Sequence, residues 1–212
     1  MNKYQVILNV AKSEKTFCLR VTRPDIRIKS GQCFNLGLPG IEINREYSIY
    51  SGSEDPYLDF LIRRVEGGLV SNSLAVLKTG DFIEVDGPYG EFCIPQNRLN
   101  SKFVFIASGT GIAPFHSFVK THGNFDYKII HGIRFSSERY DADDYEAGEY
   151  IPCISQNDGG QSIRVTDYLL KNPVESDALI YLCGNRNMII DSVQILLDQG
   201  INGDQIISEV FF

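Results

Sequence analysis

The stretch that decides the fold reads Phe103-Val104-Phe105-Ile106-Ala107-Ser108-Gly109-Thr110-Gly111-Ile112-Ala113-Pro114. Its apolar run, Phe103 to Ala107, predicts a buried strand. The two glycines predict a tight turn, and Pro114 suits the first turn of a helix. A strand, a glycine turn and a helix N-terminus together form a site for an anion such as a diphosphate. A plain strand-to-helix turn is the alternative, because the third glycine of the usual dinucleotide-binding pattern is absent.

The residues after this turn alternate between predicted strands and helices, which is typical of a doubly wound parallel sheet. The motif Cys183-Gly184-Asn185-Arg186-Asn187-Met188 comes between the last predicted strand and a helix at Met188–Gln199. Because the carboxyl ends of parallel strands line one crevice, we expect this motif and the Gly109 turn to face the same ligand. The further predicted strands are Tyr127–Gly132, Tyr150–Ile154 and Leu179–Leu182.

The first hundred residues have a different rhythm. Short β-rich runs separated by glycine and proline turns predict a small antiparallel barrel, which a helix at Ser71–Leu77 interrupts. The predicted strands are Tyr4–Val10, Thr16–Val21, Tyr47–Tyr50, Leu58–Val65 and Phe82–Val85. The sequence thus predicts two domains, a β-barrel over residues 1–98 and an α/β domain over residues 99–212.

Composition and charge argue against several classes of protein. The 212 residues are 43% hydrophobic and 22% charged, as in a folded chain, and the net charge of −7 argues against nucleic acid as a partner. No apolar run has the length of a membrane span and the N-terminus lacks a signal-peptide pattern, so we expect a cytoplasmic protein. The five cysteines show no metal-binding spacing. Neither do His116, His122 and His131, which we interpret as packing residues.

Two motifs in the barrel half carry further chemistry. In Arg45-Glu46-Tyr47-Ser48, an arginine can neutralise a diphosphate, an aromatic ring can stack on another ring, and a hydroxyl can bond a ring nitrogen. Alone, this motif is also an ordinary polar start of a strand. In Arg63-Arg64-Val65-Glu66-Gly67-Gly68-Leu69-Val70-Ser71, a glycine turn enters a helix whose first N–H groups are free to bind an anion.

These motifs together resemble the ferredoxin–NADP⁺ reductase family. Arg-x-Tyr-Ser, Gly-x-x-Ser, Gly-Pro-Tyr-Gly, Gly-Thr-Gly-Ile-Ala-Pro, Cys-Gly-Asn-x-x-Met and a terminal Glu-Val-Phe-Phe occur in the order of that family. The resemblance extends from about residue 3 to the end of the chain. It implies an antiparallel FAD-binding barrel followed by a doubly wound NAD(P)-binding domain.

The resemblance assigns roles in the barrel half. Arg45 and Ser71 would hold the FAD diphosphate, Tyr47 would pack on the isoalloxazine ring, and Ser48 would lie near its N5 atom. One terminal phenylalanine would stack on the other face of the flavin, Phe211 by alignment or Phe212 if the tail is one residue longer. The other would fill a sheet edge or the interdomain seam. The implied FAD-binding residues are Arg45, Tyr47, Ser48, Leu61, Ile62, Arg63, Arg64, Gly68, Leu69, Val70, Ser71, Phe211 and Phe212.

The resemblance also assigns roles in the second half. Ser48, Cys183 and Glu209 would surround the site of hydride transfer as catalytic residues. The family often has Ser-Arg after the third α/β strand where this chain has Ser155-Gln156, so one ligand of a 2′-phosphate is missing. Arg134 and Arg164 match positions near that phosphate, and their charge favours NADPH over NADH. The implied NADP-binding residues are Gly109, Thr110, Gly111, Arg134, Arg164, Cys183, Gly184, Asn185 and Met188.

The function that the resemblance implies is an FAD-dependent reductase. It would transfer hydride between NADPH and flavin N5, and single electrons to or from ferredoxin or flavodoxin. The alternatives are an NAD(P)H-dependent reductase subunit of an oxygenase or another multicomponent complex, and a reductase of free flavin. A nucleotide-binding subunit that moves electrons only within a complex is a further alternative.

Overall fold

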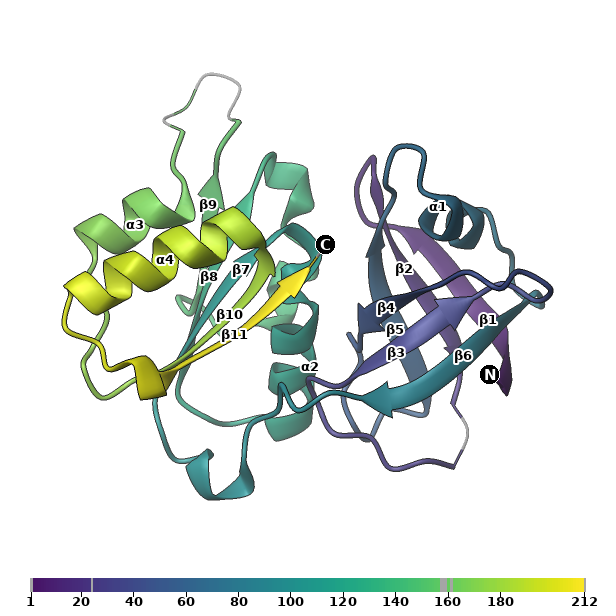
Figure 1. Ribbon diagram of the computed structural model, residues 1–212, viewed down its shortest axis with the longest axis horizontal. Helices are drawn as coiled ribbons and strands as arrows, with labels where there is room; N and C mark the ends of the chain where they lie inside the picture. The colour runs from purple at the N-terminus through teal and green to yellow at the C-terminus, as the bar shows by residue number, and fades with distance from the viewer. Residues whose placement is uncertain (1, 24, 157–159, 161, 212) are drawn as a thin grey trace. The chain divides into compact units, whose positions relative to one another are not determined.

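The computed structural model describes residues 2–23, 25–156, 160 and 162–211. The chain forms two compact units (Figure 1). Unit 1 contains the residues up to Ile94 together with Ala113–Gly123, and unit 2 contains Pro95–Ile112 and the residues from Asn124 onward. The domain boundary between residues 98 and 99 stays a prediction, and the place of helix 113–122 in unit 1 is a feature that the sequence does not predict.

Unit 1 is built on an antiparallel sheet in the order β4-β3-β6-β1-β2-β5. Ile49, which follows β4, forms a bridge with Phe60 of β5, so the two end strands meet and the sheet curls into a barrel. The side chains of Leu19, Phe34 and Leu36 are fully buried in its core. The elements are β1 (Asn2–Ala11), β2 (Thr16–Thr22), β3 (Cys33–Gly37), β4 (Asn44–Ser48), β5 (Tyr57–Arg63), α1 (Leu69–Ala75), β6 (Phe82–Tyr89) and α2 (Ala113–His122).

Unit 2 is built on a parallel sheet in the order β11-β10-β7-β8-β9. From β7 the chain adds β8 and β9 on one side, then returns to add β10 and β11 on the other. This reversal is the mark of a doubly wound sheet. The strands are β7 (Phe103–Ser108), β8 (Tyr127–Ile133), β9 (Tyr150–Ile154), β10 (Leu179–Asn185) and β11 (Ile206–Phe211).

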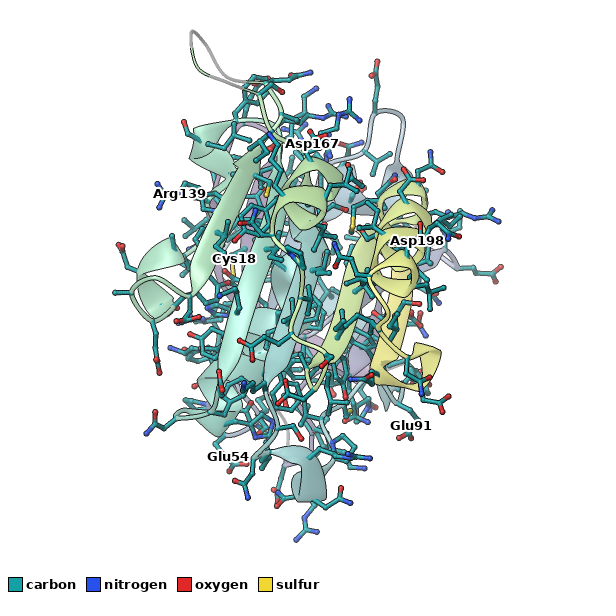
Figure 2. The ribbon with its side chains drawn as sticks, turned by 90° about the vertical axis from the view of Figure 1, so that its left-hand side faces the viewer. Cys18, Glu54, Glu91, Arg139, Asp167 and Asp198 are labelled. Atoms are coloured by element: carbon teal, nitrogen blue, oxygen red, sulfur yellow. The ribbon has the colours of Figure 1, made fainter. Side chains whose placement is uncertain are left out.

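Two helices cover one face of this sheet, α3 (Val165–Lys171) and α4 (Arg186–Asp198). Figure 2 views them from outside, with Asp167 marking α3 and Asp198 marking the end of α4. Leu169 and Leu196 from the helices pack with Ile106, Ile130 and Leu182 from the strands in one core. The short 3-10 helices are η1 (Gln96–Arg98), η2 (Gly109–Ile112), η3 (Ser136–Glu138), η4 (Ala142–Asp144) and η5 (Gly203–Gln205).

The predicted fold class is confirmed, an antiparallel barrel followed by a doubly wound parallel sheet. Two strands are missing from the sequence prediction, β3 and β11. Strand β4 also lies three residues earlier than the predicted start, because it pairs with β3 from Gly37↔Asn44 to Cys33↔Ser48. Short strands of this kind are defined by their partners rather than by a long alternating pattern. In the described part of the chain, no helix has the length and apolar content that crossing a bilayer requires.

Candidate functional site

The two glycine motifs of unit 2 meet where the sheet reverses direction. Strands β7 and β10 are neighbours, with Ala107 opposite Cys183 in the ladder. The Gly109 turn leaves the carboxyl end of β7, and Gly184 and Asn185 end β10. Ligands of doubly wound sheets bind at this switch point. The two motifs therefore lie together at one edge of the sheet, and the expectation that they face the same ligand stays a prediction.

Two of the glycines are required by the packing of these motifs on each other. A Cβ atom on Gly111 would lie 2.3 Å from the carbonyl oxygen of Cys183. Gly184 has a φ of +131°, and its Cβ would lie 2.4 Å from Ser108 Oγ. That hydroxyl accepts a hydrogen bond from the Asn185 N–H at 2.8 Å. Gly111 and Gly184 thus hold two backbone segments in direct contact, which is a packing role that the motif alone does not reveal.

Gly109 has a different environment. Its φ is +55°, a conformation that favours glycine, and a Cβ placed on it would have nothing within 4 Å. Thr110 follows it in the first turn of η2, where backbone N–H groups have no partner inside the helix. Of the glycines in this motif, Gly109 is therefore the one that leaves room beside the backbone for a ligand.

Cys183 and Glu209 lie opposite each other on β10 and β11. The Cys183 side chain is fully buried, and burial, with a smaller contribution from the Glu209 charge, raises the pKa of its thiol well above the usual value. Cys183 is therefore a neutral thiol at neutral pH, suited to packing rather than to nucleophilic attack. The third predicted catalytic residue, Ser48, belongs to unit 1, where it ends β4 and is buried.

Arg134 and Arg164 come to one edge of the unit 2 sheet. Ile133 pairs with Ile154 in the ladder, and Ile163 donates its N–H to the Ile154 carbonyl at 2.9 Å. The residues that follow these three are Arg134, Ser155 and Arg164, so the structure gathers both arginines beside Ser155-Gln156. Both arginine side chains are exposed.

A carboxylate binds the backbone of each of these arginines. The Arg134 N–H donates to Glu138 at 2.8 Å, and the Arg164 N–H donates to Asp167, marked in Figure 2, at 2.9 Å. Two acidic side chains therefore offset part of the positive charge at this edge.

Asn185 and Met188 have structural contacts of their own. The Asn185 side chain caps α4 by accepting N–H bonds from Asn187 at 3.0 Å and Met188 at 3.4 Å. Met188 packs against the core of unit 2, and Ser192 donates its hydroxyl to the Met188 sulfur at 3.6 Å. These contacts account for the residue types at both positions without a ligand.

In unit 1, β4 presents the Arg-x-Tyr-Ser motif. The Arg45 guanidinium is exposed and donates one N–H to the Asn44 carbonyl at 2.8 Å. Tyr47 packs against the barrel core, and burial raises the pKa of its phenol to about 12, so the ring is uncharged at neutral pH. A cation beside a neutral aromatic ring suits a ligand that combines a phosphate with a flat ring system.

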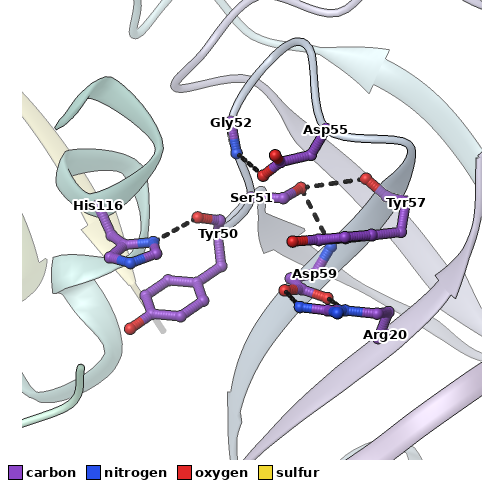
Figure 3. A network of polar contacts seen from close by, with 8 residues as sticks. All are labelled: Arg20, Tyr50, Ser51, Gly52, Asp55, Tyr57, Asp59 and His116. Atoms are coloured by element: carbon purple, nitrogen blue, oxygen red, sulfur yellow. Dashed lines mark hydrogen bonds and ion pairs between the residues drawn. The ribbon is translucent and has the colours of Figure 1, made fainter. Parts of the chain in front are cut away.

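A polar network fixes the chain directly after this motif (Figure 3). His116 of α2 stacks on Tyr50 with ring centroids 3.8 Å apart, and its Nδ1 lies 2.6 Å from the Tyr50 carbonyl oxygen. Ser51 accepts the Asp59 N–H at 3.1 Å, and Asp59 pairs with Arg20 through two bonds of 2.8 Å. Helix α2 and β5 thus hold the end of the β4 segment in place.

The loop before α1 is held by side chains of that helix. Ser71 Oγ accepts the Val65 N–H at 3.1 Å. The Asn72 amide donates to the carbonyls of Val65 at 2.8 Å and Gly68 at 2.6 Å, and Arg64 donates to the Asn72 amide oxygen at 3.3 Å. Asn72 lies one residue beyond the predicted motif, and no signal in the sequence marks it.

The other predicted residues of unit 1 divide by burial. Leu61, Ile62 and Val70 are buried, whereas Arg64 and Leu69 are exposed. Ser71 is also buried, and because its oxygen accepts from Val65, its own O–H hydrogen is left to donate to another acceptor. Arg63 and Gly68 have intermediate exposure.

The chain end continues the unit 2 sheet. Phe211 is the last residue of β11 and lies opposite Asn185 of β10, with intermediate exposure. Phe212 lies outside the described residues. The predicted stacking of one of these rings on a flavin stays a prediction.

Comparisons with known proteins give a family model for each of the two sheets. Residues 4–94 match the model of the oxidoreductase FAD-binding domain, and residues 105–194 match the model of the oxidoreductase NAD-binding domain. The crystal structure of a ferredoxin NADP⁺ reductase from Neisseria gonorrhoeae has a TM-score of 0.81 at 22% identity. It covers 100% of this chain and 98% of its own, and it shares the fold.

The alignment with this chain covers different shares of the length of two curated relatives. The toluate 1,2-dioxygenase electron transfer component of Pseudomonas putida is 30% identical over 207 residues, 89% of this chain and 61% of the relative. A ferredoxin–NADP reductase of Azotobacter vinelandii is 26% identical over 242 residues, 94% of this chain and 93% of the relative. The chain spans about half to three fifths of the length of several relatives that are oxygenase or demethylase components.

The matched domains coincide with the barrel that carries Arg45, Tyr47 and Ser71 and with the sheet whose switch point joins the Gly109 and Cys183 motifs. The chain therefore belongs to the ferredoxin–NADP⁺ reductase-like flavoprotein oxidoreductases, with an FAD-binding and an NAD-binding domain.

Proposed function

We propose that this protein exchanges a hydride with NADPH through bound FAD and passes single electrons to or from ferredoxin or flavodoxin. The observation that carries the proposal is the junction of the Gly109 and Cys183 motifs at the switch point of the unit 2 sheet. FAD supplies the conversion between two-electron and one-electron chemistry. A cytoplasmic location is part of the same proposal and rests on the sequence alone.

The donor set of unit 1 fits FAD. Arg45 offers an exposed guanidinium for a diphosphate, and the buried Ser71 hydroxyl has a hydrogen to donate. Tyr47 offers an uncharged ring beside them. We assign the diphosphate to Arg45, Ser71 and the backbone of Leu69 and Val70, and the flavin ring to Tyr47 and Ser48. Leu61, Ile62, Arg63, Arg64 and Gly68 complete the proposed contacts.

The turn of unit 2 fits a nicotinamide coenzyme. The space beside Gly109, which a Cβ would fill, allows a diphosphate to approach the backbone N–H groups of η2. We assign the nicotinamide to the neighbourhood of Cys183 and Glu209, which lie opposite each other at the carboxyl ends of β10 and β11. The residues of this chain align the coenzyme and exclude water, and both effects favour hydride transfer.

The experiment is to purify the protein, measure its FAD content, and follow its reduction by NADPH and by NADH through the flavin absorbance. We expect one non-covalent FAD per chain and faster reduction by NADPH. The reduced protein is then offered ferredoxin, flavodoxin, free FMN and an oxygenase component. A protein that is colourless and cannot be reconstituted with FAD contradicts the proposal.

A reductase component of an oxygenase is the second candidate, and the 30% identity to the Pseudomonas putida electron transfer component favours it. The first candidate is supported by the 26% identity to the ferredoxin–NADP reductase of Azotobacter vinelandii. The acceptor assay separates the two. Reduction of ferredoxin or flavodoxin supports the first, reduction of an oxygenase component alone supports the second, and reduction of free FMN alone indicates a flavin reductase.

The preference for NADPH rests on the two exposed arginines at the edge of β8 and α3. Replacing Arg134 and Arg164 by alanine is expected to lower kcat/KM much more for NADPH than for NADH. The Gln156→Arg variant restores the cation that the family often has and is expected to raise the preference further. Equal losses with both coenzymes would show that neither arginine contacts the 2′-phosphate.

A further inference from the structure

A buried histidine lies directly behind the Gly109 turn. His131 is in β8, is fully buried, and makes two hydrogen bonds in which both ring nitrogens take part. Its Nε2 lies 2.8 Å from the Gly109 carbonyl oxygen, and its Nδ1 lies 2.8 Å from the Tyr150 hydroxyl of β9. Three segments far apart in the sequence thus meet at one imidazole.

The partners of His131 determine where its hydrogen is. A backbone carbonyl only accepts, so Nε2 must carry the hydrogen and donate it to Gly109. Burial lowers the pKa of His131 to about 4, so the ring is neutral at pH 7 and its Nδ1 accepts. The Tyr150 hydroxyl is therefore the donor to Nδ1. A hydroxyl donor at Nδ1 selects the Nε2–H tautomer, the only neutral form that can hold the Gly109 carbonyl.

Tyr150 is itself held in position. Its ring stacks on the buried ring of Tyr145, with centroids 5.0 Å apart and an angle of 13° between the planes. The Arg139 guanidinium lies 6.0 Å from the centroid of the Tyr150 ring. Burial also raises the pKa of the Tyr150 phenol, so it keeps the hydrogen that it donates.

The bond to His131 fixes the direction of one peptide group in the turn. The only cis bond of the described chain is Gly87–Pro88, so the peptide that joins Gly109 to Thr110 is trans. In a trans peptide the C=O and N–H groups point in opposite directions. With the carbonyl held by the buried ring, the Thr110 N–H points to the other side of the turn, away from His131.

A glycine peptide needs such an anchor. Gly109 has a positive φ and open space where its side chain would be, so side-chain sterics add little to the short η2 helix in holding this peptide. Rotation would exchange the positions of the Thr110 N–H and the Gly109 carbonyl. A turn that should present hydrogen-bond donors to a phosphate would then present an acceptor, which repels it.

We propose that His131, kept in its Nε2–H tautomer by Tyr150, is a positioning residue that holds the Gly109–Thr110 peptide in the orientation that binds the coenzyme diphosphate. This inference rests on the proposed function. It extends that function from the residues of the glycine turn to a pair of side chains behind it, which acts on any ligand with a diphosphate and does not distinguish NADPH from NADH.

Three variants test the proposal in the FAD-loaded protein. His131→Leu removes both hydrogen bonds. Tyr150→Phe removes only the hydroxyl and keeps the stacked ring. His131→Gln is the matched control, because a glutamine amide reaches about as far as Nε2 and can still donate to Gly109. Dissociation constants for NADP⁺ and for NAD⁺ are measured by flavin difference spectra, with FAD content and melting temperature as checks on folding.

We expect His131→Leu to weaken both coenzymes by about tenfold, the effect of losing one well-oriented donor to a charged group. Tyr150→Phe should weaken the binding of both coenzymes by a smaller factor. It should raise KM for the reduced coenzymes while kcat stays near the wild-type value. His131→Gln should restore most of the affinity. The alanine variants of Arg134 and Arg164 should behave differently, because they are expected to weaken the binding of NADP⁺ but not of NAD⁺.

The tautomer gives a readout that is independent of coenzyme binding. In protein labelled with ¹⁵N-histidine, we expect the His131 ring to show a protonated Nε2 and an unprotonated Nδ1, and this pattern to be lost in Tyr150→Phe. A protonated Nδ1 in the wild-type protein overturns the proposal. So does wild-type affinity for both coenzymes in a folded Tyr150→Phe and His131→Leu. Failure of the wild-type protein to bind either coenzyme overturns the proposed function instead.

Discussion

The loop before α1 in unit 1 and the turn before α2 in unit 2 are both glycine segments between a strand and a helix, yet different forces hold them. The unit 1 loop is tied by polar side chains of its own helix, Ser71 and Asn72, within a few residues of the glycines. The unit 2 turn is held in two ways. The backbone of β10 packs directly on Gly111, and His131 of β8 is hydrogen-bonded to the Gly109 carbonyl. One support is local and polar, and the other is distant in sequence and partly steric.

The difference determines what a substitution in each segment should do. Arg64 of this loop and Arg45 of β4 are exposed, and both are proposed to bind a ligand, so their loss should affect binding more than folding. A glycine wedged between two backbone segments has no such freedom, because any side chain must displace a strand. Variants in the two segments can therefore separate stability from affinity.

The largest effect is expected for Gly184→Ala. Its φ of +131° is strained for alanine, and the new methyl group would lie 2.4 Å from Ser108 Oγ and 2.8 Å from the Ser108 carbonyl oxygen. Strain and overpacking together should lower the free energy of unfolding by about 3 kcal/mol or more. Urea denaturation of the apoprotein measures this loss.

Gly109→Ala is the matched control in the same motif. Its methyl group would meet nothing within 4 Å, so only the left-handed backbone conformation costs energy, about 1 kcal/mol. Its main effect should be on coenzyme binding, because the methyl group fills the space assigned to the diphosphate. Equal destabilisation by both variants would show that contact between the two motifs is not what Gly184 provides.

Arg45→Ala tests the ligand contacts proposed for unit 1. The arginine is exposed on β4 and donates one N–H to the neighbouring Asn44 carbonyl, so the apoprotein should be as stable as the wild type. Loss of a charge-assisted bond, about 1.5–3 kcal/mol, should weaken FAD roughly tenfold to a hundredfold. Fluorescence titration of the apoprotein with FAD measures it, and Arg27→Ala, an exposed arginine of the same unit, is the control. A lower melting temperature with unchanged FAD affinity contradicts the assignment.

Stability in acid should depend on the buried histidine of unit 2. The folded pKa of His131 is about 4 and the unfolded value is about 6.5. In this interval the unfolded chain binds a proton that the folded chain does not, so stability falls as the pH falls. His131 should contribute a loss of about 2 kcal/mol between pH 7 and pH 5.

The measurement is the melting temperature of the wild type and of His131→Gln at both pH values. The rings of Tyr140 and Tyr150 contact His131, and its Nε2 is bonded to the Gly109 carbonyl. None of these carries a charge that would hold a proton on the imidazole. The same pH dependence in wild type and variant would show that His131 titrates normally.

The sequence predicts the two glycine segments equally well but not their supports. Runs such as Phe103–Ala107 and Leu179–Leu182 predict buried strands because their apolar pattern is local. Strand β3 and strand β11 are missed because pairing with β6 and β10 defines them. His131 looks like an ordinary core residue in the sequence. Its bond to Gly109 spans 22 positions and depends on strand register, which no motif encodes.

The smallest effect is expected for the C-terminal residues Phe211 and Phe212. They belong to unit 2, and one of their rings is proposed to stack on the flavin bound by unit 1. Phe211 ends β11 opposite Asn185, two residues after Glu209. An aromatic ring stacked on the flavin is worth about 0.5–1.5 kcal/mol beyond its buried area, which a coenzyme anchored by its diphosphate can displace. Deleting Phe211 and Phe212 should therefore leave FAD bound, increase the affinity for NADP⁺ about two- to tenfold, and raise kcat/KM for NADH relative to NADPH.

Deleting Phe212 alone shows which ring is responsible. Titration with NADP⁺ while the flavin absorbance is followed gives the affinities, and unchanged affinity with a lower melting temperature would mean that the rings only pack at the sheet edge.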